Sequence, residues 1–196
     1  GTWDSTTKTN WSATSGGAGG ATVPTSADDV YIDANSGSGT YTVTQTGGTN
    51  DCRNFTISGL TTQSLTFRAV GINCYGSWSS QGTQVTFVNL VSTVYISLLA
   101  TTTGQTFNTN GVSMPFNITI GGGSGAYYTL GSNLNLTASN SNFTVSNGTF
   151  NIGSYTTTSS RFYVNTSTTL VSSNGTVTCN GTGVATGSTL FTHTSA

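Results

Sequence analysis

The sequence has almost no charge over most of its length. Residues 70–196 contain one charged side chain, Arg161, and the whole chain contains no Glu. Proton transfer in hydrolases and lyases depends on carboxylates, imidazoles or amines placed at the reacting atoms. The only imidazole, His193, has no acidic residue near it in the sequence to orient it as a Ser-His-Asp triad requires. We therefore expect a non-enzymatic protein without a cofactor.

The lack of clustered basic residues and of long apolar runs excludes two further classes, nucleic-acid-binding proteins and membrane-spanning proteins. The four basic residues, Lys8, Arg53, Arg68 and Arg161, are scattered, whereas nucleic-acid binding needs clustered Lys and Arg. The most apolar stretch, residues 88–100, is interrupted by Asn, Ser and Thr, and a membrane-spanning helix needs about 18 or more apolar residues in a row. A net charge of -1 leaves little repulsion between copies. We expect self-association, with no nucleic-acid partner and no membrane span.

Short segments with alternating polar and apolar residues fill the rest of the chain. Each is four to six residues long, which is the pattern of a strand, and clusters of Gly, Asn and Ser separate them, as in turns. The strands predicted in this way cover residues 30–33, 40–44, 54–58, 64–67, 84–89, 93–97, 105–109, 116–120, 127–130, 134–137, 143–146, 149–152, 161–164 and 176–179. No helical periodicity of useful length is present. The fold class is all-β.

Two all-β architectures fit this pattern. An antiparallel β-sandwich has strands every 8–12 residues or so, whereas a parallel β-solenoid has two or three short strands in each coil of about 20 residues. The very short strands favour the solenoid. Stacked coils also align like residues about 5 Å apart, so Asn and Thr can hydrogen-bond along the axis while like charges repel. We expect residues 1–29 to form an N-terminal cap or assembly segment and residues 30–196 to form the solenoid body.

The spacing of two cysteines fits the solenoid. Cys52 and Cys74 are 22 residues apart, which is about one coil, so equivalent positions would lie about 4.8 Å apart on neighbouring coils. That separation falls within the range for a disulfide. We predict a Cys52–Cys74 disulfide, with two unrelated buried thiols as the alternative. The third cysteine, Cys179, has no assigned role.

The N-terminal part has a recognisable pattern, W-D-x5-N-W-S…G-G-A-G-G…V-P-T-x-x-D-D-V-Y-I-D-A-N-S-G-S-G, within residues 3–40. It resembles a group of uncharacterised phage-encoded and bacterial-surface β-helix-like repeat proteins. The later phrases at residues 105–120 and 147–153 are similar to the repeating body of that group. The resemblance implies a right-handed parallel β-helix displayed outside a cell or on a virion, and it implies no catalytic residues.

The acidic residues are confined to the start of the chain. Asp28, Asp29 and Asp33 form the only cluster. Carboxylate oxygens could bind Ca²⁺ or support glycoside hydrolysis. Turn formation and strand capping are the more ordinary roles of Asp at such positions. We expect no metal site, and we keep these three residues as a weak calcium candidate.

Aromatic residues and sequons give the remaining candidates. Trp3 and Trp11 could stack on sugars, but we expect them to plug the first coil, because a solenoid needs capped ends. A surface strip for glycan contact could be formed by Tyr75, Trp78, Tyr127 and Tyr128, with core packing as the alternative. Nine N-x-S/T sequons are candidates for glycosylation: Asn10, Asn54, Asn117, Asn135, Asn142, Asn147, Asn165, Asn174 and Asn180.

Three functions remain open on the sequence alone. The first is a self-assembling structural subunit of an extracellular or virion surface fibre. The second is a glycan-binding adhesin or phage receptor-binding segment. The third is a β-helical polysaccharide-cleaving enzyme, for which only Asp28, Asp29, Asp33 and Asp51 could supply a carboxylate. We favour the structural subunit, located outside a cell, on a cell surface or on a virion surface.

Overall fold

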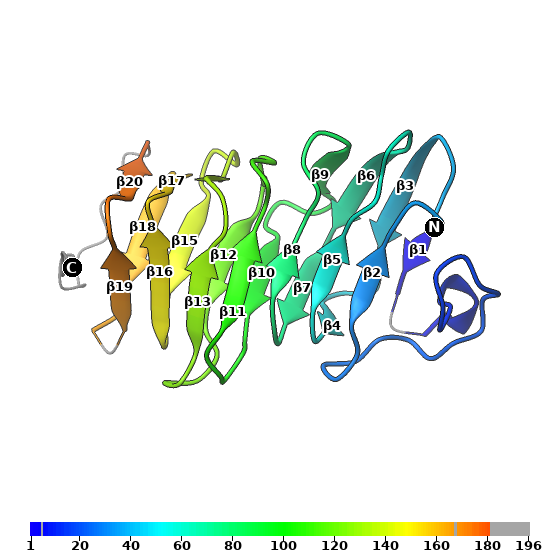
Figure 1. Cartoon of the computed structure of the whole chain (residues 1–196), viewed down its shortest axis with the longest axis horizontal. Helices are drawn as coiled ribbons and strands as arrows, with labels where there is room; N and C mark the ends of the chain where they lie inside the picture. Colours follow the sequence, from blue (N-terminus) through cyan, green and yellow to red (C-terminus); the bar gives the residue numbers. More distant parts are fainter. Residues whose placement is uncertain (5, 167, 181–196) are drawn as a thin grey trace.

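The chain forms a column of parallel β-strands (Figure 1). This computed structural model describes residues 1–4, 6–166 and 168–180. The parallel sheets build a β-solenoid of about seven turns, consistent with the right-handed parallel β-helix predicted from the sequence. The β-sandwich alternative is wrong, because a sandwich is built from antiparallel sheets. The one helix among the described residues is the short 3-10 helix η1 (Lys8–Asn10).

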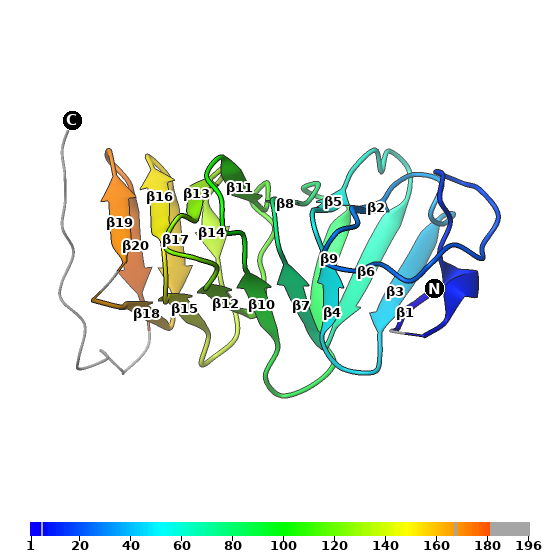
Figure 2. The ribbon, with the colours of Figure 1, turned by 90° about the horizontal axis from the view of Figure 1, so that it is seen from below.

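Each coil visits three sides of the column in the same order (Figures 1 and 2). The first side is a seven-stranded sheet of β2 (Val30–Ile32), β5 (Phe55–Ile57), β8 (Trp78–Ser79), β11 (Gln105–Asn108), β13 (Tyr127–Leu130), β16 (Thr149–Gly153) and β19 (Thr169–Ser172).

The second side is made of two sheets. A four-stranded sheet contains β1 (Thr2–Trp3), β3 (Thr40–Gln45), β6 (Ser64–Ala69) and β9 (Val85–Asn89), and a three-stranded sheet contains β14 (Leu134–Asn135), β17 (Thr156–Ser159) and β20 (Thr176–Cys179). Between them a single parallel bridge joins Met114 to Leu136.

The third side is a six-stranded sheet of β4 (Asn50–Cys52), β7 (Gly71–Cys74), β10 (Tyr95–Leu98), β12 (Asn117–Ile120), β15 (Asn142–Val145) and β18 (Arg161–Val164).

The coils differ in length but their strands stay in register. From β2 onward, partnered positions on neighbouring coils are as few as 19 residues apart, from Phe143 to Phe162, and as many as 29 apart, from Trp78 to Phe107. The extra residues lie in the corners between strands. Asn110 and Gly111 form one such corner with positive φ angles of 48° and 79°, which Asn and Gly tolerate better than other residues. Variation in coil length therefore leaves the seven-stranded and six-stranded sheets continuous, whereas the second side is divided between β9 and β14.

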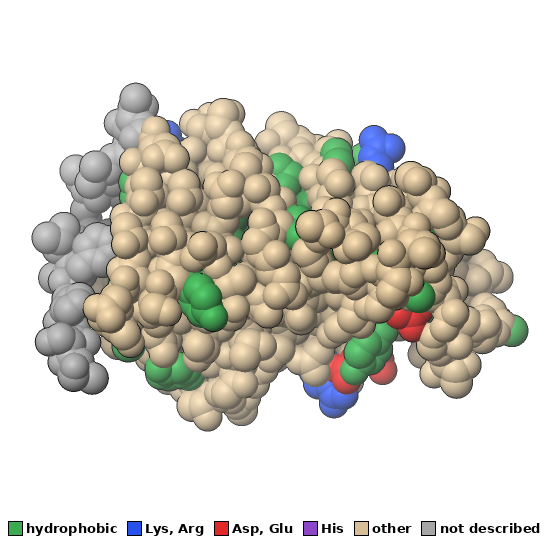
Figure 3. Space-filling model, turned by 45° about the horizontal axis from the view of Figure 1, so that its top comes forward, with side chains coloured by type: hydrophobic (Ala, Val, Ile, Leu, Met, Phe, Trp, Pro, Cys, Tyr) green, Lys and Arg blue, Asp and Glu red, His purple; other side chains and the backbone are tan. Residues whose placement is uncertain are grey.

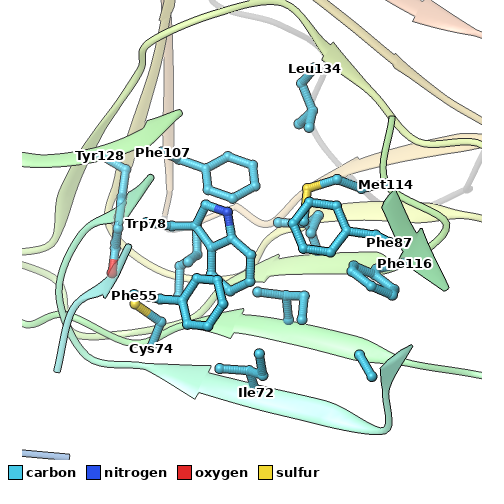
Figure 4. Close-up of a cluster of buried hydrophobic side chains, with 14 of the residues drawn as sticks. Phe55, Ile72, Cys74, Trp78, Phe87, Phe107, Met114, Phe116, Tyr128 and Leu134 are labelled. Carbon is cyan, nitrogen blue, oxygen red and sulfur yellow. The ribbon is translucent and has the colours of Figure 1, made fainter. Parts of the chain in front are cut away.

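The core is one continuous column of buried apolar side chains (Figure 4). In its first half, Phe55 stacks on Trp78 with ring centroids 4.1 Å apart, and Phe107 follows at 6.3 Å from Trp78. In its second half, Phe143 lies 4.9 Å from Phe150. Each fully buried side chain of this size contributes roughly 1.5–3 kcal/mol. Because no single coil can bury its own apolar face, the coils are stable only when stacked.

The N-terminal residues close one end of the column. Trp3 is 1% exposed and stacks on Phe55 with an interplanar angle of 8°, and Trp11 packs edge-on against Trp3 at 5.4 Å. The prediction that these indoles plug the first coil is confirmed. Strand β1 of this segment also pairs with β3, so residues 1–29 contribute a strand to the second side as well as a cover.

Corner amides tie each coil to the next. Gln45 is fully buried, and its Oε1 accepts hydrogen bonds from the backbone N–H groups of Val70 and Gly71 at 2.8 and 2.9 Å. Asn54 Oδ1 accepts from Ser77 N–H at 2.7 Å. On the outer surface, Asn73 donates to Asp51 along the axis at 2.9 Å. A buried backbone group must find a partner, and the amides of Gln45 and Asn54 supply one at these corners.

Candidate functional site

The acidic cluster does not form a shared site. Asp28 accepts hydrogen bonds from the N–H and hydroxyl of Thr25 at 2.9 and 2.7 Å. Asp29 forms a two-pronged ion pair with Arg53, both contacts at 2.8 Å, and also accepts from Asn54. Asp33 caps the turn that follows β2 through Asn35 N–H at 2.9 Å. Each carboxylate is therefore occupied locally, as the turn and capping interpretation predicts.

These contacts favour the ionised carboxylates. The hydroxyl of Thr25 lowers the pKa of Asp28, the guanidinium of Arg53 lowers that of Asp29, and the hydroxyl of Ser15 lowers that of Asp33. Hydrogen bonds from Thr7 and Thr6 lower the pKa of Asp4 to about 2. A general acid in glycoside hydrolysis needs a raised pKa instead. Among the described residues, no group of three His, Cys, Asp or Glu is placed to hold a metal ion.

A cavity of about 640 Å³ lies between the N-terminal cap and the first coil. Its floor includes Trp3, Val30 and Ile32, and its walls are the Ser, Thr and Gly residues of the loop at positions 12–19. Asp29 and Asp33 reach its edge with their carboxylates already hydrogen-bonded. Hydroxyl and backbone groups make up most of the lining of the cavity, together with the exposed phenol of Tyr31.

The predicted aromatic strip for glycan contact is wrong for two of its four residues. Trp78 and Tyr128 are both 0% exposed and point into the core (Figure 4). The Tyr128 hydroxyl donates to Gly76 O and accepts from Ala100 N–H, both at 3.0 Å, and burial raises its pKa. A buried Tyr with both hydrogen bonds satisfied has a structural role.

The other two aromatic candidates lie on different parts of the surface. Tyr75 is 37% exposed and follows β7 at the end of the six-stranded sheet. Tyr127 is half-buried on the seven-stranded sheet, in register with Thr149. The four residues therefore do not form one strip.

Cys52 and Cys74 are in register on β4 and β7, as their spacing predicts. Both are buried free thiols in the structure. The hydrogen bond with Cys74 and burial raise the pKa of Cys52, and Cys74 donates to Arg53 O at 3.3 Å. The disulfide itself stays a prediction. Cys179 is exposed on β20, away from this pair.

The sequons fall into two groups by exposure. The side chains of five are exposed: Asn10, Asn135, Asn165, Asn174 and Asn180. The other four, Asn54, Asn117, Asn142 and Asn147, are buried or half-buried. The Asn54 amide accepts a hydrogen bond from Ser77 N–H and donates one to Asp29. Asn117 is 7% exposed, and its Oδ1 accepts a hydrogen bond from Asn142 N–H at 2.7 Å. The side-chain amides of Asn54, Asn117 and Asn147 are hydrogen-bonded within the fold and that of Asn142 is half-buried, so any glycan would be confined to the exposed five.

Sequence reasoning missed a row of side chains on the six-stranded sheet. Tyr95, Asn117, Asn142 and Arg161 occupy neighbouring positions on β10, β12, β15 and β18. They line a groove of about 290 Å³. The available signal was Arg161 itself, the one charge in an otherwise neutral stretch, but its neighbours are distant in sequence and become visible only with the strand register.

No family model, curated protein or solved structure matches this chain. No helix among the described residues has the length and apolarity that a membrane crossing needs.

Proposed function

We propose that this chain is a non-enzymatic structural subunit of a fibre on a cell or virion surface. The observation that carries the proposal is the outer surface of the column. Outward positions on consecutive strands repeat hydroxyl and amide side chains, as in the row Thr42, Thr66 and Thr86. On the face drawn in Figure 3, acidic side chains lie only near the N-terminal end. Flat neutral faces can pack against further copies without electrostatic repulsion.

The hydrogen bonds that the Asp carboxylates accept support a structural role over polysaccharide cleavage. The four Asp residues with a shifted pKa are all shifted downward, and Asp51 is held by Asn73. Each acts as a hydrogen-bond acceptor within the fold. An acid–base pair for glycoside cleavage would instead need one carboxyl group kept protonated near neutral pH.

The cap restricts how copies can join. Because Trp3, Trp11 and the loop around them cover the first coil, stacking through the N-terminal end is blocked, as capping segments do in other solenoids. Association therefore takes place through the sides of the column or through its other end. An extracellular or virion-surface location fits a scaffold of this kind.

The test is the assembly state of the full chain over a wide concentration range, by sedimentation velocity and negative-stain electron microscopy. We expect filaments or multi-subunit assemblies that persist in high salt, because neutral contacts are not screened. A protein that remains strictly monomeric at every concentration contradicts the proposal.

Single lysines can locate the contact. Thr86→Lys, Ser97→Lys and Thr106→Lys each place a charge on one of the three sides. We expect the variant at the interface to dissociate the assembly while the other two leave it intact, and a variant on an uninvolved side is the matched control.

A further inference from the structure

The groove on the six-stranded sheet has the chemistry of a binding site. It is lined by Asn89, Thr93, Tyr95, Asn117, Asn142 and Arg161, together with backbone and small polar side chains of the neighbouring corners. The row from Tyr95 to Arg161 crosses four consecutive strands, a length of about 14 Å at the usual strand spacing. An aromatic ring stands at one end of this row and a guanidinium at the other.

The guanidinium of Arg161 is available to a ligand. It makes no hydrogen bond or ion pair with any other described residue. Asp51, the one acidic residue on the same sheet, lies on β4, at the opposite edge from β18. That is about 24 Å away at the usual strand spacing, beyond the screening length of about 8 Å at physiological salt. Asn73 also donates to Asp51. The positive charge of Arg161 is thus locally uncompensated.

Two amide oxygens in the groove also lack donors. Asn89 Oδ1 and Asn142 Oδ1 are buried and accept no hydrogen bond from the described chain. A buried acceptor without a donor costs about 1–3 kcal/mol. The neighbouring Asn117 is already used, because its Oδ1 accepts from Asn142 N–H. Two unsatisfied amide acceptors therefore lie beneath the lining of the groove, next to a cation that calls for an anion.

We propose that this groove binds an acidic oligosaccharide. The carboxylate or sulfate of the sugar pairs with the fork of Arg161, and sugar hydroxyls hydrogen-bond with the amide and hydroxyl side chains that line the groove. The ring of Tyr95, 49% exposed, stacks on a sugar face at the other end. The lining is mostly Ser, Thr and Asn, whose hydroxyl and amide groups match the many hydroxyls of a sugar.

The binding site is independent of the fibre proposal, since it rests on one groove of a single chain. A failure of binding leaves the assembly state untouched, and a monomeric protein can still bind sugar.

The test uses the full chain and isothermal titration calorimetry with three probes: an oligogalacturonate, a heparin-derived oligosaccharide, and neutral maltohexaose. We expect at least one acidic probe to bind at least tenfold more tightly than maltohexaose. Titration at pH 3 separates the two anions, because carboxylates begin to protonate there whereas sulfate stays charged. Binding lost at pH 3 identifies a carboxylated sugar, and binding retained identifies a sulfated one.

Matched variants separate a site from general charge attraction. Arg161→Gln should weaken acidic-sugar binding tenfold or more, and Tyr95→Ala should weaken it severalfold. The control is Arg68→Gln, which removes an exposed arginine from β6 on another side, and it should bind like the unmodified chain. Equal losses in Arg161→Gln and Arg68→Gln, equal binding of neutral and acidic probes, or no binding of any probe would each overturn the proposal. Circular dichroism of each variant verifies that it is folded.

Discussion

The two ends of the described chain differ in how many charged residues they carry. The first two coils and their cap carry all five Asp residues and three of the four basic residues, whereas residues 70–196 contain Arg161 alone. Near the cap, Asp29 sits across from Arg53 and Asn54, which belong to the next coil. In the body, the equivalent outward rows are hydroxyls, such as Ser97, Thr119 and Thr144.

This comparison indicates that the column tolerates charged residues. It excludes like charges at positions that are register partners on neighbouring coils. Arg53 and Asn73, each on the next coil, meet Asp29 and Asp51 with a cation and an amide donor, whereas Asp28 and Asp33 are met by donors within their own turns. Like charges directly opposite each other on neighbouring strands are destabilising. A solenoid whose neighbouring coils repeat the same outward residues is therefore uncharged along those rows, unless charges of opposite sign alternate from coil to coil.

The largest expected effect is on the free energy of unfolding, and it compares the core of the solenoid body with the plug formed by Trp3 and Trp11. Trp78→Ala removes a side chain that packs against Phe55, Phe87 and Phe107, and we expect a loss of about 4–5 kcal/mol in the free energy of unfolding. Trp3→Ala should cost less, about 3 kcal/mol, because the cap can partly close over the space.

Denaturant unfolding measures both losses. Trp11→Ala, at a half-exposed position beside Trp3, is the control and should cost the least of the three. If Trp3→Ala has no more effect than Trp11→Ala, the first coil does not need its plug.

Two glycines provide a second comparison. A Cβ at Gly122 would collide with Ala100 O in the preceding coil of the body, and a Cβ at Gly19 would collide with Thr9 O in the cap. We expect Gly122→Ala to cost about 2–3 kcal/mol, because both backbones are fixed by their coils.

The cap loop is not held between coils, so it can shift, and we expect Gly19→Ala to cost about 1 kcal/mol. Thermal unfolding monitored by circular dichroism tests this order. Equal costs would mean that the cap is as rigid as the body. Gly123→Ala, whose Cβ would meet only side-chain and Cα atoms of Thr101 at ordinary contact distances, is the matched control.

A third prediction introduces aligned charges into the body. Thr119 and Thr144 are register partners on β12 and β15. We expect the double variant Thr119→Asp/Thr144→Asp to be less stable than the sum of its single variants by about 0.5–1 kcal/mol, and we expect the excess to shrink in 1 M salt.

The control pair is Thr119→Asp with Thr86→Asp, which lies on a different sheet, and its effects should add. Urea unfolding at low and high salt measures the coupling. A double variant on β12 and β15 that is simply additive would falsify the repulsion argument.

The smallest expected effect is a pH dependence confined to the cap. Arg53 lowers the pKa of Asp29 below its ordinary value of 3.8, so the ion pair stabilises the folded state fully above that value. The contribution is lost as the pH falls through the lowered pKa. Because the Arg53 side chain is 55% exposed, we expect only about 0.5 kcal/mol.

Asp29→Asn should therefore lower the free energy of unfolding at pH 7 and have little effect near pH 2. Arg53→Gln should show the same pH profile. A loss that is equally large at both pH values would indicate that Asp29 acts through its hydrogen bonds to Asn54 rather than through its charge.

The sequence predicted strands wherever apolar residues alternate, and it failed where the inward positions are polar. Strand β17 (Thr156–Ser159) has Thr157 and Ser159 buried inside the column, so its pattern carries no hydrophobic signal. Its pairing is set by β14 and β20 on either side. Strand β7 was missed for a different reason: its Ile72 and Cys74 are buried in the core, but its Gly71 and Asn73 are typical of turns.

The same limit applies to the sites. Alternation shows that a residue lies in a strand, but an aromatic residue such as Trp78 is equally plausible on either face of a short strand. The groove could not be found from the sequence, because Asn117, Asn142 and Arg161 are brought together by coils of unequal length. Local signals such as the capping by Asp28 and Asp33 were predictable, because their partners are within three residues.

The unequal coils also have an evolutionary consequence. A coil of 19 residues and one of 29 residues present the same strands to the core, and the difference is contained in surface corners. Insertions and deletions at exposed corner positions that make no contact with a neighbouring coil are thus largely neutral for folding. The corners can diversify while the sheets stay under selection for stacking, and one scaffold can acquire new surface specificities without rebuilding its interior.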